Sequence, residues 1–217
     1  GEATITLKAV DDGAPPAESA EQTFKITVTP VNDAPGFAKG ADQAVDEDSG
    51  IAGTHVVTGW ATAISAGPAN ESGQTLTFNV TGNTNPALFT GTGLPFVDPA
   101  TGSLSFTTAP DTNGEATITL TLSDNGGLAN GGADTSAAQT FKITVTAVND
   151  APGFTKGADQ TVDEDAGAQT VTPWATAISP GPADESGQSV SFTVTNDNPL
   201  LFSVAPAVAS AGPTSIS

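Results

Sequence analysis

The sequence predicts an all-β protein built from tandem β-sandwich modules of about seven strands each. Segments such as "TFKITVT" alternate strictly between apolar and polar residues, and no segment has helical periodicity of note. Clusters of Gly, Asn, Asp and Pro, such as "DPATG" and "DNGG", separate these segments and indicate tight turns. Long passages also occur twice, which indicates a repeated structural unit of about 115 residues.

The repeated passages define the phase of the unit. "GEATITL" begins at Gly1 and again at Gly114, "FKITVT" at Phe24 and Phe141, and "WATAIS" at Trp60 and Trp174. Length differences between the copies lie in or beside expected loops, where insertions are tolerated. We therefore expect residues 1–35 to match the end of one repeat, 36–150 to form a complete repeat, and 151–217 to begin the next.

The complete repeat contains the strands of one sandwich. In chain order, they are expected around Ala44–Val45, Val56–Trp60, Thr75–Val80, Phe89, Leu104–Thr107, Ala116–Leu122 and Thr140–Thr146. Their apolar residues point to one side, and Thr, Asn and Lys point to the other. This pattern is typical of an immunoglobulin-like sandwich, in which one apolar row from each sheet forms the core. Trp60 and several Phe residues supply its largest side chains.

Composition and charge exclude several classes of partner. The 217 residues include 24 acidic residues and five lysines but no arginine, giving a net charge of −19. Nucleic acid and anionic membranes would repel such a chain, whereas cations such as calcium would be attracted. No apolar run reaches the roughly 20 residues that a membrane helix needs, so we expect no membrane insertion. The absence of Cys excludes disulfides and zinc–thiolate sites. The first residues, "GEATITLKAV", are expected to form a strand rather than a secretory leader.

The sequence predicts no enzymatic activity. His55 is the only histidine, and it lies where one copy is three residues longer than the other. Paired carboxylates could hydrolyse glycosidic bonds, but here the acids recur with the repeat, as architectural features do. Trp60 and Trp174 could form a platform for sugars, although their place at the start of "WATAIS" in both copies favours packing in the core.

Three passages resemble a known family. They are "FVDPATGSLSFTTAPD" (96–111), "AVDDGAPP" (9–16) and "FKITVTPVNDAPGF" (24–37). They are similar to the cadherin-like repeats found in tandem in large bacterial surface and adhesion proteins. The resemblance implies Greek-key sandwiches, an extracellular location and calcium bound between modules. The sequence departs from the family linker, because Pro30 and Ala147 stand where an Asp is usual, and Ala34 and Ala151 where an Asn is usual.

The resemblance also suggests which residues meet at the joints between modules as calcium ligands. After the complete repeat they are Glu47, Asp111, Asn149, Asp150, Asp184 and Glu185, and before it Asn32, Asp33, Glu71 and Asp124. Carboxylates concentrated at a joint repel one another, and a divalent ion would relieve this repulsion and stiffen the joint. The alternative is that Asn and Asp beside Pro cap turns and that the other acids are solvated.

These features predict a non-catalytic extracellular structural protein that forms a stalk, fibre or filament at the cell surface. The alternative is an adhesion module that binds a carbohydrate or protein partner through its loops. The loop 124–139 is the only candidate for such binding, and its Gly- and Ala-rich sequence without aromatic residues favours a spacer. The partners of the protein would be neighbouring repeats or copies of the same chain. Residues 151–217 carry the early strands of a sandwich and 1–35 the late ones, so the chain is either an excerpt of a longer array or able to polymerise head-to-tail.

Overall fold

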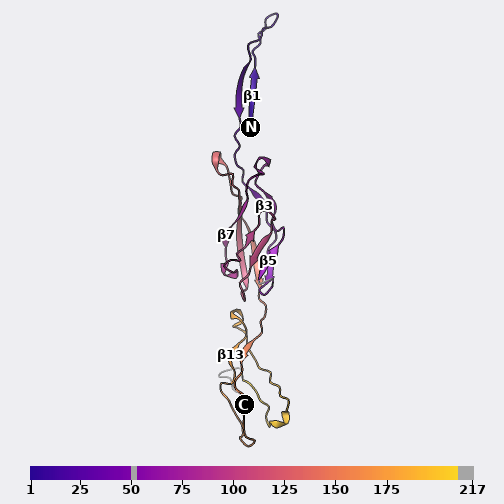
Figure 1. Ribbon diagram of the computed structural model, residues 1–217, viewed down its shortest axis with the longest axis vertical. Coiled ribbons are helices and arrows are strands. Elements are labelled where there is room, and N and C mark those ends of the chain that lie inside the picture. Colours follow the sequence, from indigo (N-terminus) through magenta and orange to yellow (C-terminus); the bar gives the residue numbers. More distant parts are fainter. Residues whose placement is uncertain (50–52, 210–217) are drawn as a thin grey trace.

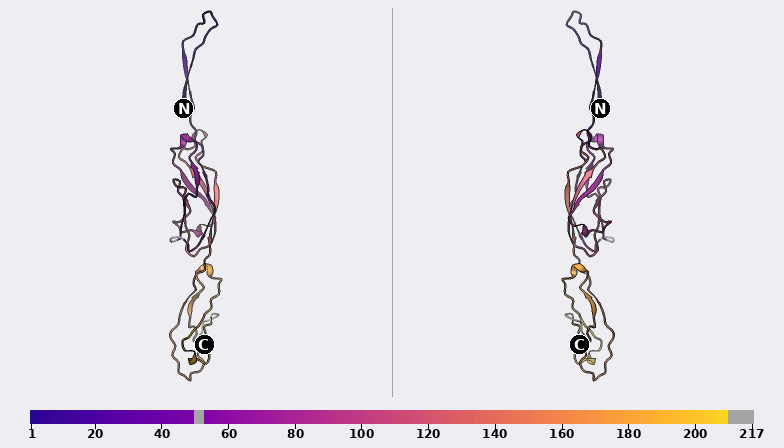
Figure 2. Two further views of the ribbon diagram at one scale, coloured as in Figure 1. Left: turned by 90° about the vertical axis from the view of Figure 1, so that its right-hand side faces the viewer. Right: turned by 90° about the vertical axis from the view of Figure 1, so that its left-hand side faces the viewer.

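The computed structural model describes residues 1–49 and 53–209. The molecule is elongated, with a two-stranded hairpin at one end, a two-sheet sandwich in the middle and an open partial module at the other end (Figures 1 and 2). The hairpin consists of β1 (Glu2–Leu7) and β2 (Gln22–Thr27), which pair antiparallel. The three parts follow one another along the long axis, so the links between them determine the shape of the molecule.

The central sandwich contains two facing layers of strands. The first is a sheet with the order β4 (Gln43–Asp46), β11 (Gln139–Thr146), β10 (Gly114–Ser123) and β7 (Thr77–Asn83). The second layer contains the pair β3 (Gly36–Ala38) and β6 (Thr62–Ser65), and the sheet β5 (Thr54–Val57), β9 (Leu104–Thr107) and β8 (Phe96–Val97). This is the immunoglobulin-like and cadherin-like β-sandwich that the sequence predicts.

The sandwich has more and shorter strands than the alternation predicts. The described residues between 36 and 150 form nine strands, partly because the first strand is divided between the two layers. Its first half, β3, pairs antiparallel with β6, and its second half, β4, pairs parallel with β11. The strand expected at Val56–Trp60 ends at Val57 instead, because Gly59 has a φ of +62° and turns the chain. Phe89 forms only an isolated bridge with Thr108.

The core lies between the two layers. In β10 the inward residues are buried and alternate with outward polar residues, as a half-buried strand requires. Trp60 is buried in this core, where its indole ring lies 4.5 Å from the ring of Phe141 and its Nε1 donates a hydrogen bond to Ala41 O at 2.8 Å. The preference for a core position at Trp60 is therefore confirmed.

The C-terminal part has the local contacts of the sandwich but few of its strands. It forms β12 (Gly153–Thr155) and β13 (Thr176–Ser179), which pair antiparallel. The rings of Phe154 and Phe192 meet edge to face at 5.0 Å, as those of Phe37 and Phe78 do at 4.9 Å. Residues 160–163 and 191–197, which correspond in sequence to β4 and β7, are not assigned as strands. In the sandwich these two segments pair with β11 and β10.

Short 3-10 helices are the only helical elements in the described residues. They are η1 (Ala69–Glu71), η2 (Pro86–Leu88), η3 (Ala129–Gly131), η4 (Ala183–Glu185) and η5 (Pro199–Leu201). Within this part of the chain, no helix has the length and apolar character needed to span a membrane. Two of the short helices, η1 and η4, occupy corresponding places beside the two joints.

Candidate functional site at the module joints

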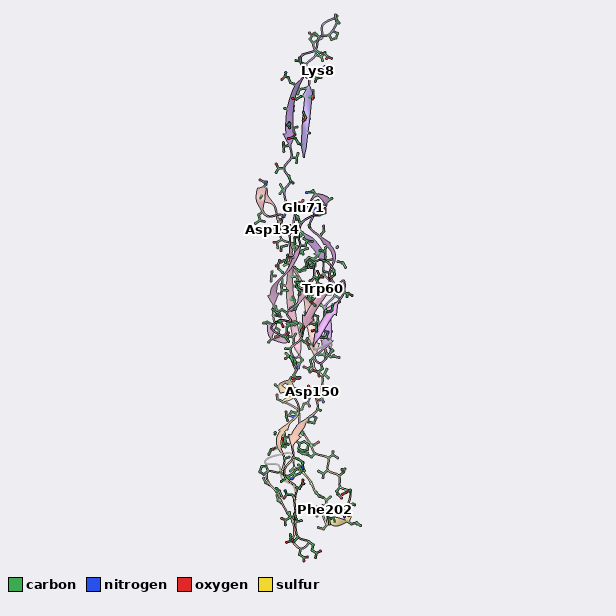
Figure 3. The ribbon with its side chains drawn as sticks, viewed as in Figure 1. Lys8, Trp60, Glu71, Asp134, Asp150 and Phe202 are labelled. Atoms are coloured by element: carbon green, nitrogen blue, oxygen red, sulfur yellow. The ribbon has the colours of Figure 1, made fainter. Side chains whose placement is uncertain are left out.

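The linker between the sandwich and the C-terminal part is held from both sides. Glu47, which follows β4, accepts a hydrogen bond at Oε1 from the backbone N–H of Val148 at 2.7 Å. Glu185, which ends η4, accepts one at Oε1 from the backbone N–H of Asp150 at 2.6 Å. Two amides that lie two residues apart are therefore bound by opposite modules. Figure 3 shows Asp150 between the sandwich and the C-terminal part.

The linker before the sandwich repeats one half of this arrangement. Glu71, at the end of η1, accepts a hydrogen bond from the backbone N–H of Asp33 at 3.1 Å. Glu71 and Glu185 are only 5% and 4% exposed, which is unusual for glutamate and indicates a specific structural role. We call each pair of a buried glutamate and a linker amide a glutamate clamp.

The clamps of Glu71 and Glu185 each require a glycine four residues before the glutamate, because the buried carboxylate occupies the space that a Cβ would take there. A Cβ at Gly67 would overlap Glu71 Oε2, and a Cβ at Gly181 would overlap Glu185 Oε2. The following prolines begin the short helices that carry the glutamates. The segments "GPANESG" and "GPADESG" therefore form seats for buried carboxylates. The sequence analysis named Glu71, Asp184 and Glu185 of these segments as metal ligands but did not identify the seats, although the recurring Gly–Pro before Glu is the signal that could have done so.

The first joint also contains a side-chain network around Asn32. Asn32 Nδ2 donates hydrogen bonds to Asp124 Oδ1 at 2.9 Å and to Ala133 O at 2.6 Å. Its Oδ1 accepts a hydrogen bond from Gln74 Nε2 at 2.6 Å. Asp124 and Ala133 belong to the long loop between β10 and β11, so this loop binds the linker. Gln74 was not predicted as part of the site.

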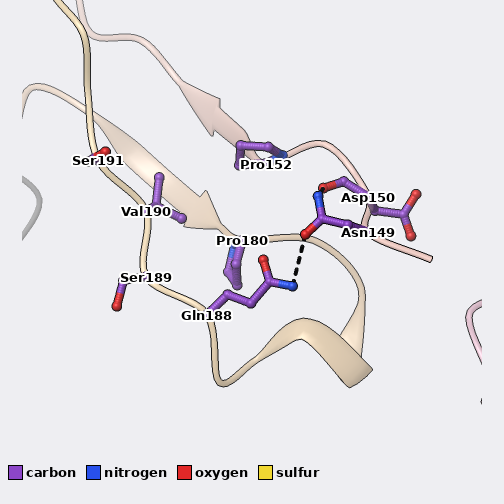
Figure 4. A pocket seen from close by; sticks show the side chains of 8 residues that line it. All are labelled: Asn149, Asp150, Pro152, Pro180, Gln188, Ser189, Val190 and Ser191. Carbon is purple, nitrogen blue, oxygen red and sulfur yellow. Dashed lines mark hydrogen bonds between the residues drawn. The ribbon is translucent and has the colours of Figure 1, made fainter. Parts of the chain in front are cut away.

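The second joint contains only part of this network. Asn149 Oδ1 accepts a hydrogen bond from Gln188 Nε2 at 3.1 Å, whereas its Nδ2 donates to the neighbouring Asp150 O at 3.1 Å (Figure 4). Across the joint, Asn113 Nδ2 donates to Asp184 Oδ2 at 3.2 Å. The sandwich and the C-terminal part are thus linked directly as well as through the linker.

Negative charge is concentrated at the second joint. The pKa of Asp150 is raised above its usual value, first by burial and then by the negative charges of its neighbours. In decreasing order of effect, these neighbours are Asp48, Glu185, Asp111 and Asp184. Asp48 was not among the predicted site residues. Burial and the charges of these acids therefore both disfavour the ionised form of Asp150.

Several buried oxygens at the joints accept no hydrogen bond. At the second joint they are Glu47 Oε2, Asp150 Oδ2 and Glu185 Oε2, and at the first joint Glu71 Oε2, Gln74 Oε1 and Asp124 Oδ2. A buried carboxylate oxygen without a partner is costly, and a cation is one group that would satisfy it. However, no group of three or more His, Cys, Asp or Glu side chains in the described residues is arranged to hold one ion. The acids influence one another electrostatically, but as placed they do not form a coordination shell.

All ten predicted site residues lie at the two joints, but their observed contacts differ. Asn32 is hydrogen-bonded to Asp124, and Glu71 to the Asp33 backbone. At the second joint, Glu47 and Glu185 bind the linker backbone. Asn149 is hydrogen-bonded to Gln188. Asp111 and Asp184 make the ionised form of Asp150 less favourable through their charge. Their role as metal ligands stays a prediction.

His55 and Trp174 have local packing roles. The His55 ring stacks on Phe106 with centroids 5.1 Å apart, and burial lowers the pKa of His55, which favours the neutral imidazole. Trp174 Nε1 donates to Ala158 O at 3.0 Å, which repeats the bond from Trp60 to Ala41. Trp174 is half-buried, whereas Trp60 is 4% exposed.

Comparisons with known proteins identify solved structures only. No protein-family model matches the chain, and no curated protein matches it. The structure is similar to the EC1-2 region of human protocadherin-24, with 14% identity, a TM-score of 0.47 and coverage of 68% of this chain and 66% of that one. It is also similar to the EC22-24 region of mouse cadherin-23, with 22% identity, a TM-score of 0.46 and coverage of 99% of this chain and 63% of that one. The chain thus spans slightly less than two thirds of the length of each structure.

Proposed function

We propose that this chain is a non-catalytic, extracellular structural repeat protein that builds length at a cell surface as part of a stalk, fibre or filament. Its modules comprise residues 1–35, 36–150 and 151–217, and their partners are neighbouring repeats or copies of the chain joined head-to-tail. The observation that carries the proposal is the double glutamate clamp, in which Glu47 and Glu185 bind Val148 and Asp150 of one linker. A clamp from both sides restricts bending at the joint.

The long loop between β10 and β11 supports the spacer function over binding of a ligand. This loop was the candidate binding loop in the sequence, but Asp124 and Ala133 bind Asn32 of the linker. Thr75 N also donates to Asn125 Oδ1 at 2.9 Å. These contacts engage the loop in the joint, where it stabilises the end-to-end arrangement of modules.

We propose that calcium stiffens the joints further. At the second joint, Glu47, Asp150 and Glu185 would contribute their unpartnered oxygens, with Asn149, Asp111 and Asp184 close by. At the first joint, Glu71 and Asp124 would do so, with Asn32 and Asp33 close by. The support is the set of buried oxygens without a partner, together with the raised pKa of Asp150. A bound calcium ion would supply positive charge and oxygen coordination, which would relieve the repulsion among these carboxylates.

Thermal unfolding with calcium and with excess chelator tests the calcium proposal. Free calcium at about 100 times its dissociation constant would stabilise the folded state by about 2.7 kcal/mol, which is several degrees for a module of this size. Asp150→Asn should reduce this shift, whereas Glu115→Gln, on an exposed ion pair with Lys142, should preserve it. An equal melting temperature in both conditions would contradict the calcium proposal and leave the glutamate clamps as the source of stiffness.

Small-angle X-ray scattering tests the spacer function independently of calcium. The wild-type chain should have a narrow, rod-like distance distribution. The double variant Glu47→Ala/Glu185→Ala should have a shorter average length, because the linker loses its hydrogen bonds to both modules. Unchanged scattering from this variant would show that the clamps do not determine the stiffness of the joint.

A further inference from the structure

The outer face of the sheet β5–β9–β8 carries exposed apolar side chains in one row across the strands. Val56 of β5 pairs with Ser105 of β9, and Ser105 pairs on its other side with Phe96 of β8. Val56 is 61% exposed and Phe96 is 54% exposed. The residues that follow Phe96 and Ser105, namely Val97 and Phe106, are buried, so the row itself faces outward. We call Val56, Ser105 and Phe96 the outer row.

Exposed apolar side chains are concentrated at this face. Between residues 36 and 150, five of the large apolar side chains that the structure describes are exposed, namely Val56, Val80, Leu94, Phe96 and Leu128. Three of the five belong to this face or border it. Leu94 lies two residues before Phe96, and the neighbouring Gly93 O accepts a hydrogen bond from Thr107 N of β9 at 2.8 Å. Such clustering indicates an interaction surface, whereas single exposed apolar residues do not.

The same face carries no charge, although the chain has a net charge of −19. The strands β5, β8 and β9 contain no acidic residue and no lysine. Asp98, which follows β8, accepts hydrogen bonds within its own turn. The other sheet carries Asp46, Glu115 and Lys142. Because two copies of so acidic a chain repel each other, the uncharged face is where a second copy approaches at the least electrostatic cost.

The outer row is specific to the central module. The buried glutamates of the joints recur in both copies of the repeat, as architectural features do. By contrast, Thr170 occupies the position of Val56, counted back from the two tryptophans. The segment "SVAPAVA" (203–209) occupies the position of residues 90–96 and contains no aromatic residue. The repeated architecture therefore does not require an exposed apolar row, which favours a role in binding.

We propose that two copies of this chain pair side by side through the outer face of β5–β9–β8. The pairing rests on the structural function above and deepens it, because it assigns the surface through which spacers associate laterally. A two-fold axis along β9 places Phe96 of each copy against Val56 of the other copy, with the two Ser105 residues facing each other between them. A large side chain thus meets a smaller one on both sides of the axis, as a self-complementary interface requires.

This axis keeps both molecules pointing in the same direction. The strands of the sandwich run along the long axis of the molecule, and β5 lies at its side (Figure 1). Rotation about a strand direction therefore leaves two parallel rods, which is the arrangement of spacers attached to one surface. The face is only three strands wide, so the contact between free chains is weak. Attachment to one surface raises the effective concentration and favours the paired state.

Introduced cysteines test the geometry, because the chain itself has no Cys. In Val56→Cys/Phe96→Cys, each thiol meets the other substituted position of the partner, so mild oxidation should give a covalent dimer. The two positions of one chain are two strand spacings apart, about 10 Å, which is too far for an internal disulfide. Phe96→Cys alone should remain monomeric. The matched control is Ala44→Cys/Glu115→Cys, which flanks Thr144 in the same way on the other sheet and should give little dimer.

Sedimentation velocity of the full chain tests the contact without a covalent bond. Wild type should shift from monomer to dimer as its concentration rises. Raising the ionic strength from about 0.01 M to about 0.15 M should increase the dimer, because salt screens the repulsion between the two acidic chains. Phe96→Asp should be monomeric, whereas Val80→Asp, at an exposed residue of the other sheet, should pair like wild type. Circular dichroism checks folding, and neither residue of the outer row that is substituted belongs to the core.

Three outcomes would overturn the proposal. The first is cross-linking of the control pair as strong as that of Val56→Cys/Phe96→Cys, and the second is equally strong cross-linking of Phe96→Cys alone, which would place Phe96 against Phe96. The third is wild type that stays monomeric up to its solubility limit, including the case in which it binds a neutral polysaccharide through Phe96. Failure of the spacer function is a separate result. A monomeric chain with rod-like scattering would keep that function and lose only the lateral contact.

Discussion

Glu47 and Glu185 belong to different modules, yet they accept hydrogen bonds from amides that lie two residues apart in one linker, at 2.7 and 2.6 Å. The linker contains Pro152, which fixes its own φ and restricts Ala151 before it, so this segment offers fewer alternative conformations. Because both glutamates are buried, water does not readily replace these bonds. The joint is therefore fixed by specific hydrogen bonds as well as by a short connection.

We predict that Glu71→Ala destabilises the sandwich. The substitution removes the acceptor for Asp33 N and leaves a cavity beside Gly67. Loss of one such partner costs about 1–3 kcal/mol. Chemical denaturation of the full chain should show this loss. Glu115→Ala removes an exposed ion pair with Lys142 and should cost less than about 1 kcal/mol. Equal effects of the two substitutions would contradict a structural role for the buried carboxylate.

We also predict that Gly67→Ala destabilises the sandwich, because the new Cβ overlaps Glu71 Oε2 and the residue has a φ of +145°. The expected loss is about 1–3 kcal/mol, as for other overpacked sites. Gly73→Ala is the matched control, since nothing lies within 4 Å of its Cβ position. A similar melting temperature for the two variants would show that η1 moves freely to admit the methyl group.

The sequence predicts the sandwich well because its signals are local. Alternation places Ile118, Leu120 and Leu122 on one face of a strand, and all three are buried. The division of the first strand into β3 and β4 was not predicted, because it depends on which sheet offers a partner. The same reason explains why the C-terminal part has fewer strands than its sequence predicts. The segment corresponding to β7 alternates correctly, but no strand lies beside it. Pairing is a property of two segments, and periodicity describes only one.

The candidate site was predicted by position but not by contact. The repeat places Glu71 and Glu185 at the joints, and both are there. Their hydrogen bonds to linker amides were not predicted, because a sequence does not indicate which oxygen meets which N–H. Asp48 was not predicted, although it follows the predicted Glu47 directly and its charge acts on Asp150 across the joint.

The raised pKa of Asp150 predicts how the joint responds to pH. Its usual value is 3.8, and burial together with four neighbouring acids raises it. The folded chain thus binds this proton more tightly than the unfolded chain does, so the ionised carboxylate opposes folding above the folded pKa. With chelator at pH 7, Asp150→Asn should raise the melting temperature. This gain over wild type should shrink as the pH falls through the raised pKa.

Asp98 provides the opposite case within the same experiment. Hydrogen bonds from Ala100 N and Thr101 Oγ1 lower the pKa of Asp98 below 3.8. Its carboxylate therefore favours folding above the unfolded pKa, and this contribution is lost as the pH falls through the lower folded value. Asp98→Asn should lower the melting temperature at pH 7. If Asp150→Asn also lowers it in chelator, the carboxylates at the joint do not oppose folding.

The two tryptophans should differ sharply in their effect on stability. Trp60 is 4% exposed and packs against Phe141, so Trp60→Ala should destabilise the sandwich by about 3–5 kcal/mol. Trp174 is half-buried and lies outside the core of the sandwich, so Trp174→Ala should change the denaturation of the sandwich little. Chemical denaturation of the two variants measures this difference. An equal loss of stability for both would contradict the packing of Trp60 against Phe141 as the source of the effect.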